Sequence, residues 1–358
     1  MTDDHERLLM TPGPTALPEE VREAMARPIQ NPDIEPEFTE FYRDLLDKLA
    51  RVYETEDDLL VLAGEGMLGL EASVASVVGS NDTVLCLSNG IYGTGFTDLV
   101  ENHGGEPVLH EIPPTEKFDA EAVKEAVEAH DPAVATMVHC ETPTGLLNDL
   151  EPVLSVLDEA GVLTICDAVS SLGGTEVPTE SIDICLGASQ KCFSSPPGLS
   201  TLSVSDAAWE KIESMEQHSF YLGLEPWREL EFESPPAQFP YTHSVSNCYG
   251  LDASLDLLLE EGLNNVFERH ETVAKHCREH GRELGLEPFA PQLASPTVTA
   301  FAVENASAVQ RQVANEGVVL ATGLGEFSEE ILRVGHMGYN AEIENVDRAM
   351  DALDSVLE

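Results

Sequence analysis

Basic residues are scarce in this sequence. Its 358 residues include 18 Lys and Arg against 66 Asp and Glu, so the formal net charge is -48 at pH 7. A surface this anionic repels nucleic-acid phosphates and anionic lipids, and we expect neither nucleic acid nor a membrane as a partner. The acidic residues are spread along the whole chain. This distribution suggests a halophile whose stability depends on salt.

Long apolar runs are also absent, and no stretch is apolar enough to cross a bilayer. The chain starts with the acidic residues 1–6 (MTDDHE), which lack the basic and then apolar order of a signal peptide. These features predict a cytoplasmic protein.

The cysteines are few and show no metal-binding pattern. None of them stands in C-x-x-C spacing, and several fall within apolar runs. We therefore expect buried, reduced thiols and no metal ion. The seven are Cys86, Cys140, Cys166, Cys185, Cys192, Cys248 and Cys277.

Short apolar runs and amphipathic stretches alternate from about residue 60, which is typical of βαβ units around a parallel sheet. The clearest unit has strands at 135–140 and 162–166 joined by a crossover helix at 149–160. Asn148 or Asp149 is the expected N-cap of that helix, and Gly161 follows its end.

The remaining pattern predicts an α/β chain with a large domain and a smaller C-terminal α+β domain. We expect an N-terminal arm over 1–20, a large domain over 21–262 and a small domain over 263–358. Further strands are expected at 59–62, 83–88, 107–112, 182–186, 297–303, 318–322 and 331–334, helices at 66–78, 119–129, 249–262, 263–284 and 343–357, and a loop at 225–240.

A lysine and an aspartate follow two of the predicted strands, where ligands bind in open parallel sheets. Asp167 comes directly after the strand at 162–166, and Lys191 lies among small residues after the strand at 182–186. Partial burial lowers the pKa of a lysine and prepares its amine to attack a carbonyl. Each residue also has an ordinary interpretation, Lys191 as a solvated surface residue and Asp167 as a helix cap or turn residue.

Together the two residues suit a pyridoxal cofactor, whose ring nitrogen needs a carboxylate and whose aldehyde needs a lysine. The phosphate of that cofactor needs backbone donors, and residues 64–67 (GEGM) form a glycine turn that leads from a predicted strand into a helix. Glu65 brings a negative side chain to this turn. We expect its backbone N–H to donate while its carboxylate points to water.

With these motifs, the sequence resembles the class V, fold-type I aminotransferases, specifically the alanine-glyoxylate and serine-pyruvate group. The resemblance runs from residues 11–15 (TPGPT) to 333–338 (RVGHMG) and is most specific in residues 167–174 (DAVSSLGG), 189–191 (SQK) and 196–198 (PPG). It implies pyridoxal 5'-phosphate as the cofactor and a large domain with a mostly parallel, seven-stranded sheet between helices.

By position, the resemblance implies roles for the residues around the pyridoxal ring. Lys191 matches the Schiff-base lysine, Asp167 the partner of the pyridinium nitrogen, and Gln190 a polar neighbour of the cofactor. Tyr92 falls where the family stacks an aromatic ring on the pyridoxal face. Thr142 matches a hydroxyl residue that bonds the cofactor's 3-oxygen. By themselves, Tyr92 would pass for a core aromatic and Thr142 for a turn residue.

The resemblance also assigns residues to the phosphate. Glu65, Gly66 and Met67 occupy the phosphate turn, where Glu65 departs from the small or hydroxyl residue that the group often has. Tyr241 and Ser244 match residues that reach the phosphate of the neighbouring subunit's cofactor. The active unit that this implies is a homodimer with shared active sites.

Arg333 matches the arginine that binds the substrate's α-carboxylate, for which a planar guanidinium is well suited. Its ordinary alternative is a structural salt bridge. The implied reaction is a ping-pong transfer of an amino group from a small amino acid, alanine or serine, to a 2-oxo acid, glyoxylate or pyruvate.

Several alternatives stay open at the level of the sequence. They are an aminoethylphosphonate, aspartate-glyoxylate or ureidoglycine-glyoxylate transaminase, a cysteine desulfurase, and a non-catalytic protein of the same fold. A desulfurase needs a cysteine on a mobile loop. Cys192 follows Lys191 directly and is expected to pack inward, which disfavours that alternative.

Overall fold

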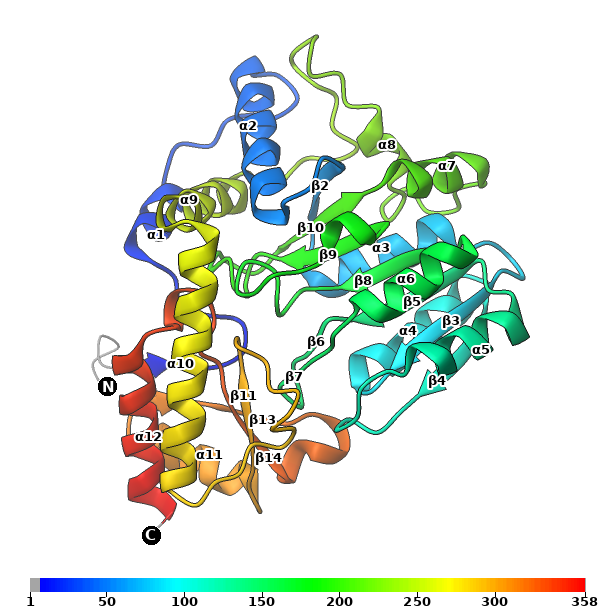
Figure 1. Cartoon of the computed structure of the whole chain (residues 1–358). Coiled ribbons are helices and arrows are strands. Elements are labelled where there is room, and N and C mark those ends of the chain that lie inside the picture. Colours follow the sequence, from blue (N-terminus) through cyan, green and yellow to red (C-terminus); the bar gives the residue numbers. More distant parts are fainter. Residues whose placement is uncertain (1–6, 358) are drawn as a thin grey trace.

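The computed structural model describes residues 7–357, and its largest feature is a seven-stranded sheet (Figure 1). The strand order is β2-β10-β9-β8-β5-β3-β4. β10 runs antiparallel to both neighbours, and the other strands are parallel to one another. The predicted α/β class and mostly parallel sheet are confirmed. The strands are β2 (Asp58–Ala63), β3 (Thr83–Ser88), β4 (Glu106–Glu111), β5 (Val134–Val138), β8 (Leu163–Asp167), β9 (Ile184–Ala188) and β10 (Leu199–Val204).

Helices cover both faces of this sheet. Figure 1 shows α5 and α6 on one face and α3 and α4 on the other. Every residue of β5, β9 and β10 is buried, as expected for strands covered on both sides. The helices that pack on the sheet include α3 (Gly66–Val77), α4 (Ile91–Asn102), α5 (Ala120–His130) and α6 (Glu151–Ala160), and α7 (Asp206–Ser214) packs against α3.

A second group of helices lies at the β2 edge of the sheet. α2 contacts both β2 and α9, and α9 also contacts α1. These helices are α1 (Glu19–Met25), α2 (Pro36–Tyr53) and α9 (Val245–Glu261). Two short elements, α8 (Glu225–Arg228) and η1 (Thr179–Ser181), lie outside this group.

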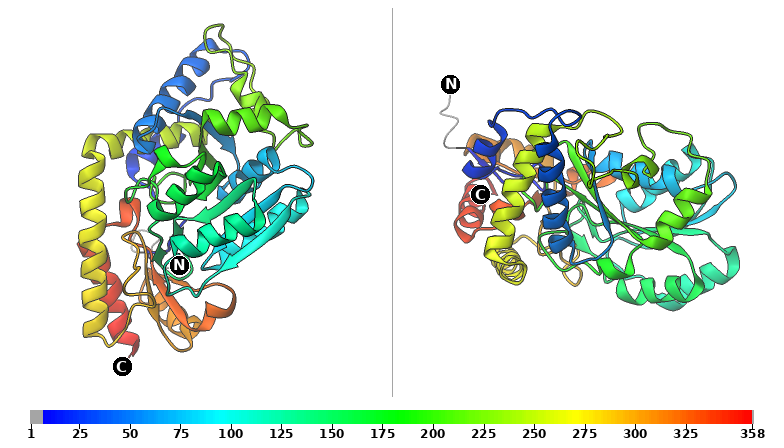
Figure 2. Two further views of the ribbon diagram at one scale, coloured as in Figure 1. Left: turned by 45° about the vertical axis from the view of Figure 1, so that its right-hand side comes forward. Right: turned by 90° about the horizontal axis from the view of Figure 1, so that it is seen from above.

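The C-terminal part has its own hydrophobic core, which includes Met10, Phe301 and Leu353. Figure 2 shows the long helix α10 (yellow) beside α12 (red) along the outside of this part. The predicted domain boundaries after residues 20 and 262 stay a prediction. The hairpin of β6 (Cys140–Glu141) and β7 (Leu146–Leu147) lies next to this part. The elements of the C-terminal part are β1 (Leu8–Leu9), α10 (Leu263–Glu283), β11 (Thr299–Ala302), α11 (Ala306–Asn315), β12 (Val318–Val319), β13 (Ala321–Thr322), η2 (Gly325–Glu329), β14 (Ile331–Val334), η3 (Gly338–Asn340) and α12 (Ile343–Leu357).

Some predicted details are wrong. The N-cap of α6 is Leu150 rather than Asn148 or Asp149, because Pro152 in the first turn fixes where the helix begins. The predicted loop at 225–240 begins with the short helix α8. The chain also contains elements that were not predicted, among them α1, α2, α4, α7 and β10.

All seven cysteines are buried and none forms a disulfide. Over residues 7–357, none of the helices combines the length and the apolar character that crossing a lipid bilayer requires. The acidic start of the chain, residues 1–6, lies outside the described residues.

Candidate active site

A cavity of about 350 Å³ opens at the carboxyl ends of β8 and β9. β8 ends at Asp167, and Gln190 and Lys191 follow the end of β9. Because the two strands are parallel neighbours, their ends bring these side chains to one edge of the sheet. The cavity is lined by Gly13, Pro14, Glu65, Gly66, Met67, Leu70, Tyr92, Thr142, Asp167, Val169, Ser170, Gln190, Lys191 and Pro197. All the residues that were predicted to bind the cofactor of their own chain are therefore in the lining.

The N-terminal segment positions Lys191 inside the cavity. Its Nζ donates a hydrogen bond to the Pro12 carbonyl oxygen at 2.7 Å. Gly13 makes room for the lysine, since a Cβ on this glycine would lie 2.4 Å from Lys191 Cδ. Burial lowers the pKa of the Lys191 amine, and the charge of Arg333 lowers it further. A lysine in this state is prepared to form a covalent bond with a carbonyl.

Asp167 presents a buried carboxylate to the same cavity. The residue is 6% exposed, and its Oδ1 accepts a hydrogen bond from the Val169 backbone N–H at 2.9 Å. Burial raises the pKa of Asp167 to about 6, although the Lys191 charge lowers it. Among the described residues, no cationic side chain forms an ion pair with this carboxylate, and a protonated ring nitrogen would provide that partner.

The residues around Asp167 and Lys191 fit a pyridoxal ring. Thr142 Oγ1 lies 2.5 Å from Ser170 Oγ, so two hydroxyls are paired at the cavity wall. Gln190 Oε1 is buried and has no hydrogen-bond partner within residues 7–357. An unpaired buried acceptor costs stability and is one observation that favours a bound polar group. Asp167, Lys191, Thr142 and Gln190 would hold the ring.

Tyr92 lies in the first turn of α4 and lines the cavity. The N-terminus of α4 is held by Glu141, which sequence reasoning missed as a site residue. Glu141 Oε1 accepts from the Gly93 N–H at 2.7 Å and Oε2 from the Tyr92 N–H at 3.4 Å. A glycine is required at position 90, because a Cβ added there would lie 2.5 Å from Glu141 Cδ. Burial raises the pKa of Glu141 to about 7, and Asp167 adds to the shift.

Arg333 lies on β14. It is not part of the cavity lining, but it contacts Thr142, which is. Its Nε donates to the Thr322 carbonyl at 2.7 Å and its Nη1 to the Thr142 carbonyl at 3.2 Å. Within residues 7–357 no acidic side chain forms an ion pair with it, so the salt-bridge alternative is not realised. Burial lowers the pKa of Arg333 to about 10. A buried guanidinium bonded only to carbonyls retains N–H groups for an anionic ligand.

The phosphate turn is the part that fits least well. Glu65 is the N-cap of α3, and its Oε1 accepts from the Met67 backbone N–H at 3.2 Å. Glu65 is exposed, as expected, but its carboxylate caps the helix instead of pointing only to water. It turns back because the N-terminus of a helix offers unsatisfied N–H groups and a partial positive charge. A phosphate can use the Met67 N–H only when Glu65 releases it.

Tyr241 and Ser244 do not line the cavity of their own chain. The Tyr241 hydroxyl accepts from the Ala63 N–H at 3.3 Å, and its ring stacks on Tyr221 with centroids 4.5 Å apart. Ser244 lies at the N-cap of α9, where its backbone N–H donates to His243 Nδ1 at 2.9 Å. Their assignment to a neighbouring subunit's site stays a prediction.

Comparison with known proteins places this geometry among aminotransferases. Residues 8–348 match the family described as Aminotransferase class-V. The chain is 36% identical over 352 residues to an uncharacterised aminotransferase of Methanocaldococcus jannaschii, covering 96% of this chain and 90% of that protein. It is 33% identical to the pyridoxamine–pyruvate transaminase of Mesorhizobium japonicum, covering 98% and 91%. The crystal structure of an alanine–glyoxylate aminotransferase from Nostoc sp. superposes with a TM-score of 0.94 at 30% identity, covering 98% of this chain and 95% of that one.

Proposed function

The chain belongs to the class V aminotransferases, and on this premise we propose that it moves an amino group from alanine or serine to glyoxylate or pyruvate. Its cofactor is pyridoxal phosphate, on which this family depends. The observation that carries the proposal is that Lys191 and Asp167, on two neighbouring strand ends, line one cavity with Arg333 bonded to its wall.

The chain's own residues supply attachment and proton transfer. When bound, the cofactor supplies a carbonyl carbon that takes the amino group and a ring that withdraws electrons from the substrate's α-carbon. Lys191 holds the cofactor through Nζ, and the same Nζ, once free, accepts the substrate's α-proton and returns it. Its lowered pKa supports this role because the neutral amine is the form that accepts a proton. Asp167 keeps the ring nitrogen protonated.

The charges around the cavity support a small substrate with one carboxylate. Arg333 orients the α-carboxylate through N–H groups that its two carbonyl partners leave free. Glu65 in the lining repels a second acidic group. Aspartate is therefore disfavoured as a donor, and aminoethylphosphonate has no α-carboxylate for Arg333 to bind. A cavity of about 350 Å³ that also holds a cofactor leaves room for a short side chain.

The desulfurase alternative finds no support at Cys192. This residue is buried, and its Sγ contacts the Ser170 carbonyl oxygen at 3.7 Å. Burial raises the pKa of the Cys192 thiol to about 12, so it stays protonated at neutral pH. A nucleophilic cysteine needs an exposed thiolate.

A half-reaction screen tests the proposed donor. The purified protein is loaded with pyridoxal phosphate, and each candidate amino acid is added without an oxo acid. Alanine or serine should convert the bound cofactor to its amine form, seen by absorbance, whereas aspartate and aminoethylphosphonate should not. The Lys191→Ala variant is the matched control and should show no conversion on the same time scale. Failure of both alanine and serine would refute the proposal.

Glu65 favours a second candidate function. A carboxylate at the phosphate turn repels a phosphate but accepts hydrogen bonds from a hydroxyl group. One relative is named pyridoxamine–pyruvate transaminase, and pyridoxamine is the form without a phosphate. In this alternative, free pyridoxamine enters the cavity as the amino donor and pyruvate is the acceptor.

Product analysis separates the two candidates. Protein without cofactor is incubated with pyruvate and either pyridoxamine or its phosphate, and alanine is measured. The second candidate requires alanine from free pyridoxamine at catalytic turnover. If only phosphate-loaded protein turns over, and only with amino acids, the first proposal stands.

We also propose a homodimer in which Tyr241 and Ser244 complete the partner's phosphate site. Both residues lie outside their own cavity, and nearby Phe220 is 76% exposed, which favours a covered surface. Mixing inactive Lys191→Ala protein with Tyr241→Ala protein tests this. A hybrid dimer would contain one intact site, so activity should return on mixing. No recovery, with hybrids demonstrated by mass, would contradict shared sites.

A further inference from the structure

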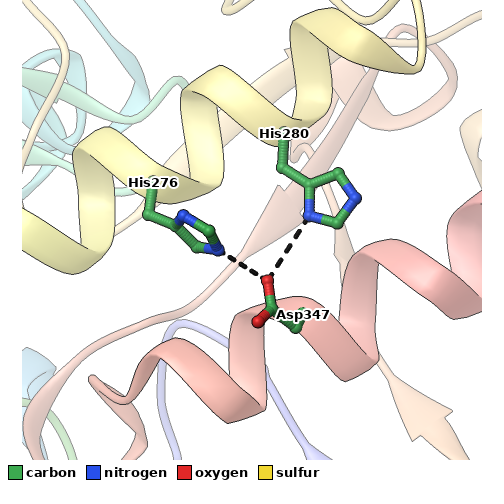
Figure 3. Close-up of side chains that lie close together, drawn as sticks. All are labelled: His276, His280 and Asp347. Carbon is green, nitrogen blue, oxygen red and sulfur yellow. Dashed lines mark hydrogen bonds and ion pairs between the residues drawn. The ribbon is translucent and has the colours of Figure 1, made fainter.

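Two histidines and an aspartate form a cluster where α10 meets α12, apart from the cavity. His276 and His280 come from α10 and Asp347 from α12 (Figure 3). His276 Nε2 lies 2.5 Å and His280 Nδ1 lies 3.5 Å from the same oxygen, Asp347 Oδ1. Within residues 7–357, no other group of three or more His, Cys, Asp or Glu side chains brings its ligand atoms this close.

The packing of the two helices explains this convergence. Residues four apart on a helix lie one above the other on the same face, so both rings project toward α12. Val273 and Cys277 of α10 and Val346 and Met350 of α12 belong to one buried hydrophobic cluster. Asp347 therefore follows a residue anchored in the core. The apolar contact fixes the backbone on both sides, and the polar cluster lies at its rim.

We propose that His276, His280 and Asp347 bind a divalent transition-metal ion of the zinc class. Imidazole nitrogen and carboxylate oxygen are both common zinc ligands. The side chains are 36%, 23% and 47% exposed, so an ion can enter from solvent and a water molecule can complete the coordination. The expectation of no metal ion came from the cysteines, and this cluster contains none.

All three ligand atoms lie within 4.8 Å of one another, so one ion can reach all of them. Ligand bonds of about 2.0 Å in a tetrahedron place neighbouring ligand atoms ~3.3 Å apart. The two nitrogen-to-oxygen distances, 2.5 and 3.5 Å, bracket that value.

An ordinary hydrogen-bonded pair explains less of the geometry. One histidine is enough to pair with Asp347, and a second imidazole directed at the same oxygen gains little in water-exposed surroundings. A divalent ion uses all three groups at once. The net charge of -48 also concentrates cations around the protein. Nitrogen ligands select zinc-class ions over Mg²⁺, which prefers oxygen.

The bound ion would join the long helix of the C-terminal part to its last helix. The ligands lie far apart in the sequence, so the unfolded chain does not present them together. Binding to the folded state alone stabilises that state by mass action. None of the three residues lines the active-site cavity, so the ion should stabilise the fold without changing the rate of transamination.

Calorimetric titration of the full-length, cofactor-loaded protein with ZnCl₂ tests the proposal. The protein is first treated with a chelator, and the titration is done in excess MgCl₂ to occupy the many surface carboxylates. We expect one Zn²⁺ per chain and a higher melting temperature with Zn²⁺ than with Mg²⁺ alone. Co²⁺ in place of Zn²⁺ should give the visible absorption of a site with nitrogen ligands.

Variants locate the site. His276→Ala and His280→Ala should each weaken Zn²⁺ binding by at least ~10-fold, since even an outer-shell partner typically contributes about 10–100-fold. Asp347→Asn should do the same. The matched control is the double variant His130→Ala/His218→Ala, which removes two exposed histidines far from the cluster in sequence. It should bind Zn²⁺ like the unmodified protein.

Two outcomes would overturn the proposal. One is the absence of stoichiometric Zn²⁺ binding to the unmodified protein, which requires no variant to fold. The other is binding that survives in the His276→Ala/His280→Ala double variant or disappears in the control.

Discussion

Burial acts in opposite directions on the two residues that define the active site. It lowers the pKa of Lys191 and raises that of Asp167 to about 6, because in both cases it disfavours the charged form. The cofactor-free cavity thus contains an amine that readily loses its proton and an acid that readily gains one. A ring that forms a covalent bond with the amine and carries a positive charge beside the acid satisfies both groups.

The first prediction is that Asp167→Asn stabilises the cofactor-free protein and removes most of its activity. The raised pKa of Asp167 means that between its ordinary 3.8 and about 6 the folded state binds more protons than the unfolded state. Stability therefore falls as the pH rises through this window. At neutral pH the asparagine avoids a penalty of up to ~3 kcal/mol. Activity should fall by about 10²–10³-fold, as when an electrostatic stabiliser is removed.

Urea unfolding of the cofactor-free proteins at pH 5 and pH 8 measures this effect. The stability difference between Asp167→Asn and the unmodified protein should be larger at pH 8. Equal differences at the two pH values would mean that Asp167 does not carry the burial penalty.

The second prediction concerns Arg333 and its planar group. Arg333→Lys keeps the charge but loses the fork that binds a carboxylate. We expect the KM for the amino acid to rise by at least ~30-fold, the equivalent of ~2 kcal/mol for a buried charge contact, with cofactor content unchanged. Arg278→Lys is the matched control, because Arg278 also donates to a carbonyl, that of Ser295 at 3.3 Å, outside the cavity. Loss of the cofactor in the Arg333 variant would assign this residue a structural role.

At the level of elements, we infer that the N-terminus of α3 discriminates between the phosphorylated and free forms of the cofactor. Glu65 occupies the Met67 N–H that a phosphate would use. Its carboxylate and a phosphate compete for the same partial positive charge.

The third prediction is that Glu65→Ser raises the affinity for pyridoxal phosphate by at least ~10-fold, or ~1.4 kcal/mol. Serine is a good N-cap, so α3 should persist. Affinity for unphosphorylated pyridoxal should not rise. Asp119→Ser is the control, since Asp119 caps α5 in the same way, accepting from the Glu121 N–H at 3.2 Å. Equal gains for both ligands would show that Glu65 does not discriminate by charge.

The elements also show what can be predicted from local sequence. β3 has the predicted bounds of 83–88, because an apolar run between turns specifies a buried strand. β10 was missed because its Ser200 and Thr201 look too polar for a buried strand. Ser200 Oγ donates to the Glu65 carbonyl at 2.7 Å, and Thr201 Oγ1 lies 2.7 Å from the Tyr53 hydroxyl. These partners are distant in sequence, so a local pattern gives no indication of them.

The same distinction applies to the site. Asp167 was predicted because it directly follows an apolar strand, and Lys191 because it lies in the small-residue loop after the next strand. The role of Glu141 was missed because it depends on Gly93 and Tyr92, which lie more than 45 residues away in sequence. α4 was missed for a related reason, since Gly93 and Gly95 weaken its local helical pattern and the cap that stabilises it comes from another strand.

For the whole molecule, the excess of acid determines how stability responds to salt. Eighteen basic residues cannot balance 66 acidic ones, and the remaining carboxylates repel one another across the surface. The compact state concentrates this repulsion more than the unfolded chain does.

The fourth prediction is that the melting temperature rises from dilute buffer to molar KCl, because salt screens the repulsion between exposed charges. Thermal unfolding followed by circular dichroism over a series of KCl concentrations measures it. Most of the rise should occur at low concentrations, where the screening length changes most. A melting temperature that does not change with salt would contradict the proposed halophilic character.

We infer that one amine, Lys191 Nζ, holds the cofactor. Borohydride reduction of the protein loaded with pyridoxal phosphate, followed by digestion and mass spectrometry, tests it most directly. We predict a single pyridoxyl mass on the peptide that contains Lys191, and none in Lys191→Ala protein treated in parallel. A reduced cofactor on any other lysine, or on none, would contradict the account.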